Sequence, residues 1–377
     1  MEVPDGLELD KGKFVCKLKK SLYGLKQSDR NWYNHVTSIM LSLDFAKCIS
    51  EPCIFFKKDI IVAVYVDDFL VSGIEEEVLK FKEIIGKIIK LKDLGPVRSF
   101  ISIQFDRPSK NVITINQSQY IKSILNEYNM SESKGISCPL QVGAHFEVKG
   151  EGEIFDRELY QKAIGSLLYN STCTRPDIAN AVCKLSQCNQ RSTVRNWRGV
   201  QNVLKYLKKT IGYRLTYKKN GVFSCYSDSD WASDKNDAKS ITGYVFNFGN
   251  GAVIWKSRKQ KCVASSSTHA EYIALYESMC EFLWLQSLLR ELSEEYLIYG
   301  REIVYCDNQG SIAIAENETI TERSKHFVVK YNFVRECINN RMIKVEYIPS
   351  SENLADLFTK SLSGPKTEMF AKAIGLL

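Results

Sequence analysis

The order of the strands and helices predicted after residue 220 constrains the fold of this chain more than any other feature. Runs of alternating and apolar residues predict strands at 222–227, 241–248, 251–263, 301–306 and 342–348. Helical periodicity predicts helices at 268–292, 308–317, 327–339 and 352–360. The resulting β-β-β-α-β-α-α-β-α order indicates an α/β domain built on a mixed sheet.

Four acidic residues lie where this element order places strand ends and helix starts. They are Asp228, Glu271, Asp307 and Asp356. Open α/β sheets bind their ligands at such ends. Four converging carboxylates would repel one another unless a cation neutralised them. Two Mg²⁺ ions about 4 Å apart could do so and could activate a water against a phosphodiester.

Each of these acids also has an ordinary structural explanation. Asp228 could be a turn residue, and its neighbour Asp230 competes for the same role. Glu271 could interact favourably with the helix dipole, Asp307 could be an N-cap, and Asp356 could be a solvated helix residue. We prefer the metal-site interpretation because the structural alternative would require four separate explanations, one for each acid, to hold at once at successive element ends.

Basic residues cluster near the acids. They are Lys256, Arg258, Lys259 and Lys261 before Glu271, and Arg323, Lys325, His326 and Lys330 further on. Phosphate binding is the functional interpretation of such a cluster. A solvated strand face is the alternative, and it is the commoner explanation for any single lysine.

A second acidic feature, Asp67 and Asp68, lies in the N-terminal part between two apolar runs. Residues 60–64 and 69–71 are rich in β-branched and apolar side chains and predict a hairpin with the acids at its tip. Adjacent carboxylates there are costly without a cation, and a two-metal nucleotidyl-transfer site would need such a pair. The alternative is a tight turn with two solvated aspartates.

The rest of the pattern divides the chain into four predicted parts: 1–130, a polar linker at 131–155 rich in Gly and Pro, an all-helical part at 156–212, and the α/β part at 213–377. Within the first part we expect a lysine-rich strand beginning near residue 11, helices at 28–43, 75–91 and 117–128, and strands at 98–106 and 111–115. The fold class predicted overall is α+β combined with α/β.

Composition excludes several other classes of protein. The net charge of +7 is compatible with nucleic-acid binding. The 12 cysteines form no C-x-x-C pair and there are only four histidines, which argues against a structural zinc protein. No apolar leader follows Met1 and no apolar run is long enough to span a bilayer, so we expect reduced cysteines, no secretion and no membrane partner.

The motifs, taken in chain order, resemble the C-terminal part of copia-type LTR retrotransposon Pol polyproteins, which spans reverse transcriptase and ribonuclease H. The matching segments are 17–27, 65–68, 91–95, 174–178, 226–232, 266–272, 307–309, 325–326, 331–336 and 355–360. The resemblance covers nearly the whole chain. It implies a partial polymerase palm and thumb, a helical connection and a ribonuclease H-like domain.

The resemblance also implies site residues. Asp67 and Asp68 would hold metal in the palm, and Gly24 and Gln27 would contact the template. The four C-terminal acids would form the ribonuclease H centre, with Asp228 preferred to Asp230 because the family's first acid follows its strand directly. Mg²⁺, or Mn²⁺ in its place, would be the cofactor, and RNA–DNA hybrid and template–primer would be the partners. Ser102 stands where the family has glycine, which would alter the turn of the primer-positioning hairpin.

Two departures from the family pattern limit these expectations. The segment 1–6 resembles a string that follows the palm's upstream aspartate, so we expect no DNA synthesis by this chain alone, and dNTP binding only with the missing part supplied. No histidine follows His326, so Glu352 could replace the loop histidine of cellular ribonucleases H. The alternative function is a catalytically inactive transposon remnant that at most binds nucleic acid. The expected location is the cytoplasm, in virus-like particles, or the nucleus.

Overall fold

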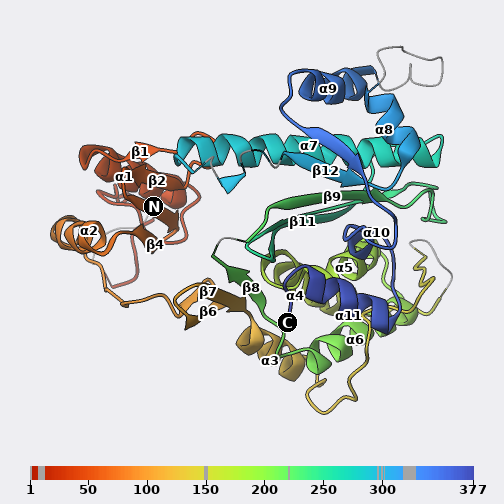
Figure 1. The fold of residues 1–377 in the computed structure, drawn as a ribbon. Coiled ribbons are helices and arrows are strands. Elements are labelled where there is room, and N and C mark those ends of the chain that lie inside the picture. The colour runs from red at the N-terminus through yellow and green to blue at the C-terminus, as the bar shows by residue number, and fades with distance from the viewer. Residues whose placement is uncertain are drawn as a thin grey trace. The chain divides into compact units, whose positions relative to one another are not determined.

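The computed structural model describes residues 2–6, 13–147, 152–219, 221–294, 297–298, 300, 302–316 and 328–377, with the side chains of 328 and 329 left out. The chain forms two compact units (Figure 1). Unit 1 comprises Met1–Gly95 with Ser287–Glu294, and unit 2 comprises Pro96–Gln286 with Glu295–Leu377. None of the described helices combines the length and the apolar character needed to cross a membrane.

Unit 1 is an antiparallel sheet packed against two helices. Its elements are α1 (Ser28–Ser42), β1 (Ala46–Lys47), β2 (Ile54–Lys57), β3 (Ile60–Tyr65), β4 (Asp68–Gly73) and α2 (Glu75–Ile88), and the sheet order is β1-β2-β3-β4. Its core includes Met40, Phe55, Val62 and Phe81. Both predicted helices and the hairpin are confirmed. The lysine-rich strand is wrong for residues 13–18, where Phe14 and Val15 are exposed and pair with no strand.

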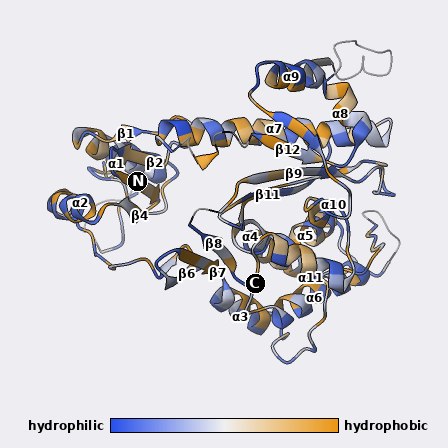
Figure 2. Cartoon of the chain, viewed as in Figure 1, coloured by the Kyte–Doolittle hydropathy of each residue, from blue (hydrophilic) through white to orange (hydrophobic). Residues whose placement is uncertain are grey.

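The helical part of unit 2 is built around one hydrophobic core. Its helices are α3 (Ser118–Glu127), α4 (Arg157–Cys173), the 3₁₀ turn η1 (Pro176–Ile178), α5 (Ala179–Ser186) and α6 (Val194–Lys209). The side chain of Arg175 is fully buried because Asp177 pairs with it at 2.6 Å and Thr210 accepts hydrogen bonds from it. Most helices carry both hydrophilic and hydrophobic residues, as expected when one face is buried (Figure 2).

A four-stranded antiparallel sheet accompanies these helices. It contains β5 (Ser99–Phe100), β6 (Ile103–Ser109), β7 (Val112–Asn116) and β8 (Leu215–Lys218), in that order. Ile101 and Ser102 form the turn between β5 and β6, and both have positive φ, +44° and +60°. The turn therefore keeps a glycine-like conformation although serine occupies the position.

The packing divides the chain differently from the predicted parts. The division between the compact units falls after Gly95, and β5–β7 belong to unit 2 because β7 pairs with β8. Described residues of the predicted linker 131–155 pack on the helices: Leu140 is buried, Phe146 packs on the helical core, and the ring of Phe155 stacks on Trp197 at 4.5 Å. Its apolar side chains hold this polar, Gly-containing segment against the helices.

The second sheet of unit 2 confirms the predicted mixed α/β domain. It contains β9 (Ser224–Ser229), β10 (Ile241–Phe248), β11 (Gly251–Lys259), β12 (Ile303–Cys306) and β13 (Lys344–Tyr347). The order is β11-β10-β9-β12-β13. The pairs among β9–β11 are antiparallel, and those joining β9, β12 and β13 are parallel.

Helices cover both faces of this mixed sheet (Figure 1). They are α7 (Ser267–Glu291), α8 (Gln309–Glu316), α9 (Val328–Asn339), α10 (Asp356–Thr359) and α11 (Gly364–Ala373). Phe282 of α7 packs on Phe246 from one face, and Phe358 of α10 joins Val245 in the core on the other. The pattern did not predict α11, whose buried residues complete that second core.

Candidate active site

The four predicted acids of unit 2 come together at one end of the mixed sheet. Because β9 and β12 are parallel neighbours with Ser227 opposite Cys306, the following residues, Asp228 and Asp307, emerge side by side. Carboxylate oxygens of Asp228, Asp307 and Asp356 lie within 4.8 Å of one another. Glu271, near the start of α7, forms a similar group with Asp307 and Cys306. Asp307 belongs to both groups, so the four carboxylates form one cluster.

Two oxygens of this cluster have no hydrogen-bond donor. Asp228, Glu271 and Asp356 are buried, with 1%, 6% and 4% of their surfaces exposed. Within the described part of the chain, Oδ1 of Asp228 and Oε2 of Glu271 are buried and accept no hydrogen bond. A buried acceptor left unsatisfied costs about 1–3 kcal/mol, and more when it is charged. A cation between these oxygens would remove that cost.

The protonation of the acids shows how strongly the cluster disfavours uncompensated charge. Burial raises the pKa of Asp228 to about 7, and the nearby carboxylates of Asp356 and Asp307 add to the effect. Burial also raises the pKa of Glu271 well above its ordinary value, again helped by Asp228 and Asp307. A set of clustered carboxylates is the donor set that hard divalent cations such as Mg²⁺ and Mn²⁺ prefer, so the residues fit such an ion.

Lys360 also belongs to the cluster, although the sequence pattern predicted no role for it. Its ammonium group pairs with Asp356, one helical turn earlier, and lies 3.4 Å from Oδ2 of Asp228. Burial works against its charge, but the carboxylates of Asp228 and Asp356 outweigh burial and raise the pKa of Lys360. The i, i+4 spacing from Asp356 was the available signal.

Hydrogen bonds from neighbouring elements position the acids. The Thr359 hydroxyl donates to Asp228, and the Ser350 hydroxyl donates to Asp307. The Gln260 amide donates to Ser229, to Thr242 and to the carbonyl of Ala270, tying β9 and β10 to the start of α7. These contacts join residues distant in sequence, so no local pattern revealed them.

Asp230, the rival of Asp228, makes a different set of contacts. Its carboxylate accepts hydrogen bonds from the backbone amide of Ile241 at 2.5 Å and from the Ser233 hydroxyl. It belongs to neither of the acid groups able to hold a metal among the described residues. This geometry favours a structural part for Asp230 and supports the preference for Asp228.

A glycine allows α10 to approach the sheet closely beside Asp228. Gly243 of β10 pairs with Asp228 in the strand register. A Cβ atom at Gly243 would lie 2.6 Å from Cγ2 of Thr359, 2.9 Å from Cβ of Phe358 and 3.1 Å from the carbonyl oxygen of Ala355. The distance between Asp356 and the strand-end acids therefore depends on the absence of a side chain there.

The acids of unit 1 lie on an exposed turn. Tyr65 pairs with Asp68 across the β3–β4 hairpin, so Val66 and Asp67 form the two-residue turn, and Val66 has a φ of +52°. The Trp32 indole of α1 donates to the Val66 carbonyl at 2.6 Å. Asp67 and Asp68 are exposed, and no third acid, His or Cys joins them within the described residues.

The predicted nucleic-acid contacts are dispersed. Arg258 pairs with Glu277 at 2.6 Å, whereas Lys259, on the opposite face of β11, pairs with Asp234 and with Asp237 at 2.8 Å. Lys256 is exposed, as are Gly24 and Gln27 near the start of α1, and Gly24 has a φ of +90°. The period of two along β11 separates its cations between two faces. Arg323, Lys325 and His326 lie outside the described residues.

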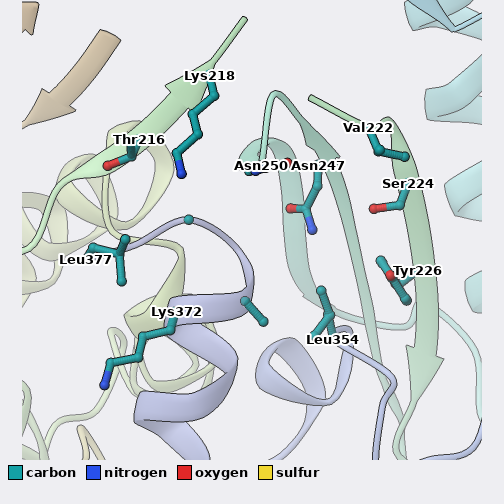
Figure 3. A pocket seen from close by; sticks show the side chains of 12 residues that line it. Thr216, Lys218, Val222, Ser224, Tyr226, Asn247, Asn250, Leu354, Lys372 and Leu377 are labelled. Carbon is teal, nitrogen blue, oxygen red and sulfur yellow. The ribbon is translucent and has the colours of Figure 1, made fainter. Parts of the chain in front are cut away.

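A pocket of about 380 Å³ lies toward the other end of β9 (Figure 3). Its lining includes Lys218, Ser224, Asn247, Leu354 and Lys372, and none of the four acids contributes to it. Ser224 begins β9 and Asp228 lies near its end, so this pocket and the acidic cluster are separate features.

Comparison with known proteins relates both units to retrotransposon polyproteins. Residues 1–142 match a family model described as reverse transcriptase (RNA-dependent DNA polymerase). The whole chain is 37% identical to the retrovirus-related Pol polyprotein from transposon TNT 1-94 of Nicotiana tabacum, and 32% identical to that from transposon RE1 of Arabidopsis thaliana. The chain spans 29% and 26% of the lengths of these two relatives.

Solved structures give a weaker likeness. A ribonuclease H1 isolated from compost by a metagenomic approach matches 37% of the chain and 93% of its own length, at 17% identity and a TM-score of 0.29. The strand order and register of the mixed sheet, rather than this likeness, describe its architecture.

Proposed function

The chain belongs to the copia-type LTR retrotransposon Pol polyproteins, and its residues 1–142 match the reverse transcriptase family model. From this premise we propose that unit 2 is a ribonuclease H segment, which cleaves the RNA strand of RNA–DNA hybrids by metal-dependent hydrolysis. The observation that carries the proposal is the convergence of Asp228, Glu271, Asp307 and Asp356, with two buried carboxylate oxygens that lack donors. A purely structural cluster would leave that desolvation uncompensated.

Divalent cations, when bound, would supply an activated water and stabilise the charge on the leaving oxygen. The four carboxylates would hold them. Thr359 and Ser350 would keep Asp228 and Asp307 in place through their hydroxyl donors. Lys360 would balance the negative charge of Asp228 and Asp356 before the cations arrive. The 2′-hydroxyl of the substrate would let the site distinguish RNA from DNA.

For unit 1 the proposal is narrower. Asp67 and Asp68 would be metal ligands of a polymerase palm, but two exposed carboxylates without a third ligand among the described residues hold two Mg²⁺ ions poorly. This supports the proposal that the chain does not synthesise DNA by itself. Robust extension of a primed template by the purified chain would contradict it.

The nuclease is tested with the full chain and a hybrid labelled on its RNA strand, with Mg²⁺ and with EDTA. We expect Mg²⁺-dependent cleavage, lost by about 10²–10³-fold in Asp307→Asn, the loss typical when one electrostatic element is removed. Asp106→Asn, which removes an exposed acid outside the cluster, is the matched control and should cleave like the wild type. A folded wild-type chain that binds hybrid and leaves it intact would favour the inactive remnant.

A further inference from the structure

Helix α6 carries a row of cations, which we call the α6 stripe: Arg195, Arg198, Lys205 and Lys209. The 16 residues of α6 contain five basic residues, these four and Lys208, and no acidic residue. At about 100° per residue the four stripe residues fall within an arc of about 80°. The opposite face is buried through residues that include Val200, Val203 and Leu207.

The side chains of the stripe are open to solvent and lack acidic partners. Arg195, Arg198 and Lys209 are exposed and Lys205 is partly exposed. In the described ranges none of the four takes part in an ion pair or a side-chain hydrogen bond. Lys372, which pairs with Glu368, is the main cause of the lowered pKa of Glu368, and Lys209 adds only a smaller effect. Like charges along one helix face destabilise the helix, so the stripe favours a polyanion that would compensate them.

Three surface lysines of unit 2 show the opposite arrangement. Lys162, Lys344 and Lys372 each pair with a glutamate, at 2.5, 2.6 and 2.7 Å. What distinguishes α6 is therefore that four such cations share one face of a helix that has no acidic residue.

Two contacts connect the stripe to the end of the sheet that carries the acids. The loop after β9, which follows Asp228, donates from the Asn236 amide to the carbonyl of Phe146 at 3.1 Å. The Phe146 ring packs against α6, so closely that a Cβ atom at Gly199 would lie 2.7 Å from it. The first turns of α6, with Arg195 and Arg198, are thus separated from the loop after β9 by one packed segment.

We propose that the α6 stripe binds the phosphate backbone of the RNA–DNA hybrid and holds it for the acidic cluster. This inference rests on the proposed function. From Arg195 to Lys209 the helix rises about 21 Å, at 1.5 Å per residue, which corresponds to about six nucleotides at 3.4 Å per nucleotide along one strand. Within the arc lies Asn202, with Gln201 beside it, rather than an apolar anchor, which suits a nucleic-acid backbone better than a membrane or a protein hot spot.

The test measures binding, so that it is separate from cleavage. The full chain carrying Asp307→Asn is titrated onto a fluorescent 18-base-pair hybrid in EDTA, over a series of KCl concentrations. The stripe variant adds Arg195→Gln, Arg198→Gln and Lys205→Gln. The matched control adds Lys162→Gln, Lys344→Gln and Lys372→Gln, which removes the same charge from ion-paired sites. Thermal melts verify that both fold.

We expect the stripe variant to bind about 10–100-fold more weakly at 100 mM KCl. The slope of log affinity against log salt concentration should be about 2–3 smaller in magnitude than in the Asp307→Asn chain, which is close to one for each phosphate contact removed. The slope and the affinity of the control variant should change little. Equal losses in both variants, or unchanged binding in the stripe variant, would overturn the proposal. Unchanged hybrid binding with lost binding to anionic phosphatidylserine vesicles would overturn it in favour of a membrane. Stripe-dependent binding, together with no Mg²⁺-dependent cleavage by the folded chain that retains Asp307, would refute the nuclease and leave the binding proposal standing.

Discussion

Gly243 offers a way to disturb the acidic cluster without changing any of its ligands. Gly243→Ala places a Cβ atom 2.6 Å from Cγ2 of Thr359 and 2.9 Å from Cβ of Phe358, and both of these residues are fully buried. Ordinary carbon contacts begin near 3.5 Å, so α10 must move by about 0.9 Å. Such overpacking costs about 1–3 kcal/mol of unfolding free energy. The same shift would carry Asp356 and the Thr359 hydroxyl away from Asp228.

A displacement of about 1 Å at a catalytic constellation can cost about 10²-fold in rate. We therefore expect Gly243→Ala to lower both the melting temperature and the single-turnover rate of hybrid cleavage. Gly165→Ala on α4 is the control, since a Cβ atom there would have no neighbouring atom within 4 Å and a helical alanine is favoured by about 0.5–1 kcal/mol. If Gly243→Ala melted and cleaved like the wild type, the close approach of α10 would not position the site.

Three further predictions follow from the electrostatics and the loops of the site. The metal-free chain should gain about 1.4 kcal/mol of unfolding free energy between pH 8 and pH 6, because Asp228, with a folded pKa of about 7, takes up a proton that the unfolded chain binds only near pH 4. This stabilisation is complete below the pKa of the unfolded chain and is lost as the pH rises through 7. Urea titrations at each pH measure the unfolding free energy, and saturating Mg²⁺ should make it independent of pH. An unfolding free energy that does not change with pH in the metal-free chain would contradict the burial argument. Lys360→Gln should lower the unfolding free energy of the metal-free chain by about 1–2 kcal/mol, less than for a fully buried pair because 41% of the lysine side chain is exposed. The same substitution removes a cation that competes with the metal, so it should strengthen Mn²⁺ binding. Weaker Mn²⁺ binding, measured by calorimetry, would refute that role of Lys360. Glu352→Gln should slow multiple-turnover cleavage several-fold if Glu352 replaces the loop histidine, and an unchanged turnover rate would remove the idea.

The element order of the mixed sheet could be predicted from sequence because each strand and helix shows its own periodicity. The same reasoning placed Asp228 and Asp307 at strand ends, and the structure adds that their strands are parallel neighbours, which brings these ends to one edge. Helix α11 was missed, although its buried residues complete the core beside α10. The lysine-rich strand failed because a pattern of alternation cannot show whether a partner strand exists.

The parts that could not be predicted depend on contacts between distant residues. The glycine and proline content of 131–155 suggested a linker, but Leu140 and Phe146 pack on helices that follow it in sequence. The pairing of β7 with β8 joins residues about a hundred positions apart, which local patterns do not encode. The contributions of Gly243 and Gln260 likewise appear only when α7, α10 and β10 are brought together, and the contact of Lys360 with Asp228 only when α10 meets β9.

The central claim is that Asp228, Glu271, Asp307 and Asp356 form the divalent-cation centre of a nuclease. The most direct test is the anomalous difference density of crystals of the chain grown with Mn²⁺. We predict a peak among the four carboxylates, in contact with Oδ1 of Asp228 and Oε2 of Glu271, and its loss in Asp228→Asn crystals. An ordered acidic cluster without a peak, at Mn²⁺ concentrations that support hybrid cleavage, would contradict the claim.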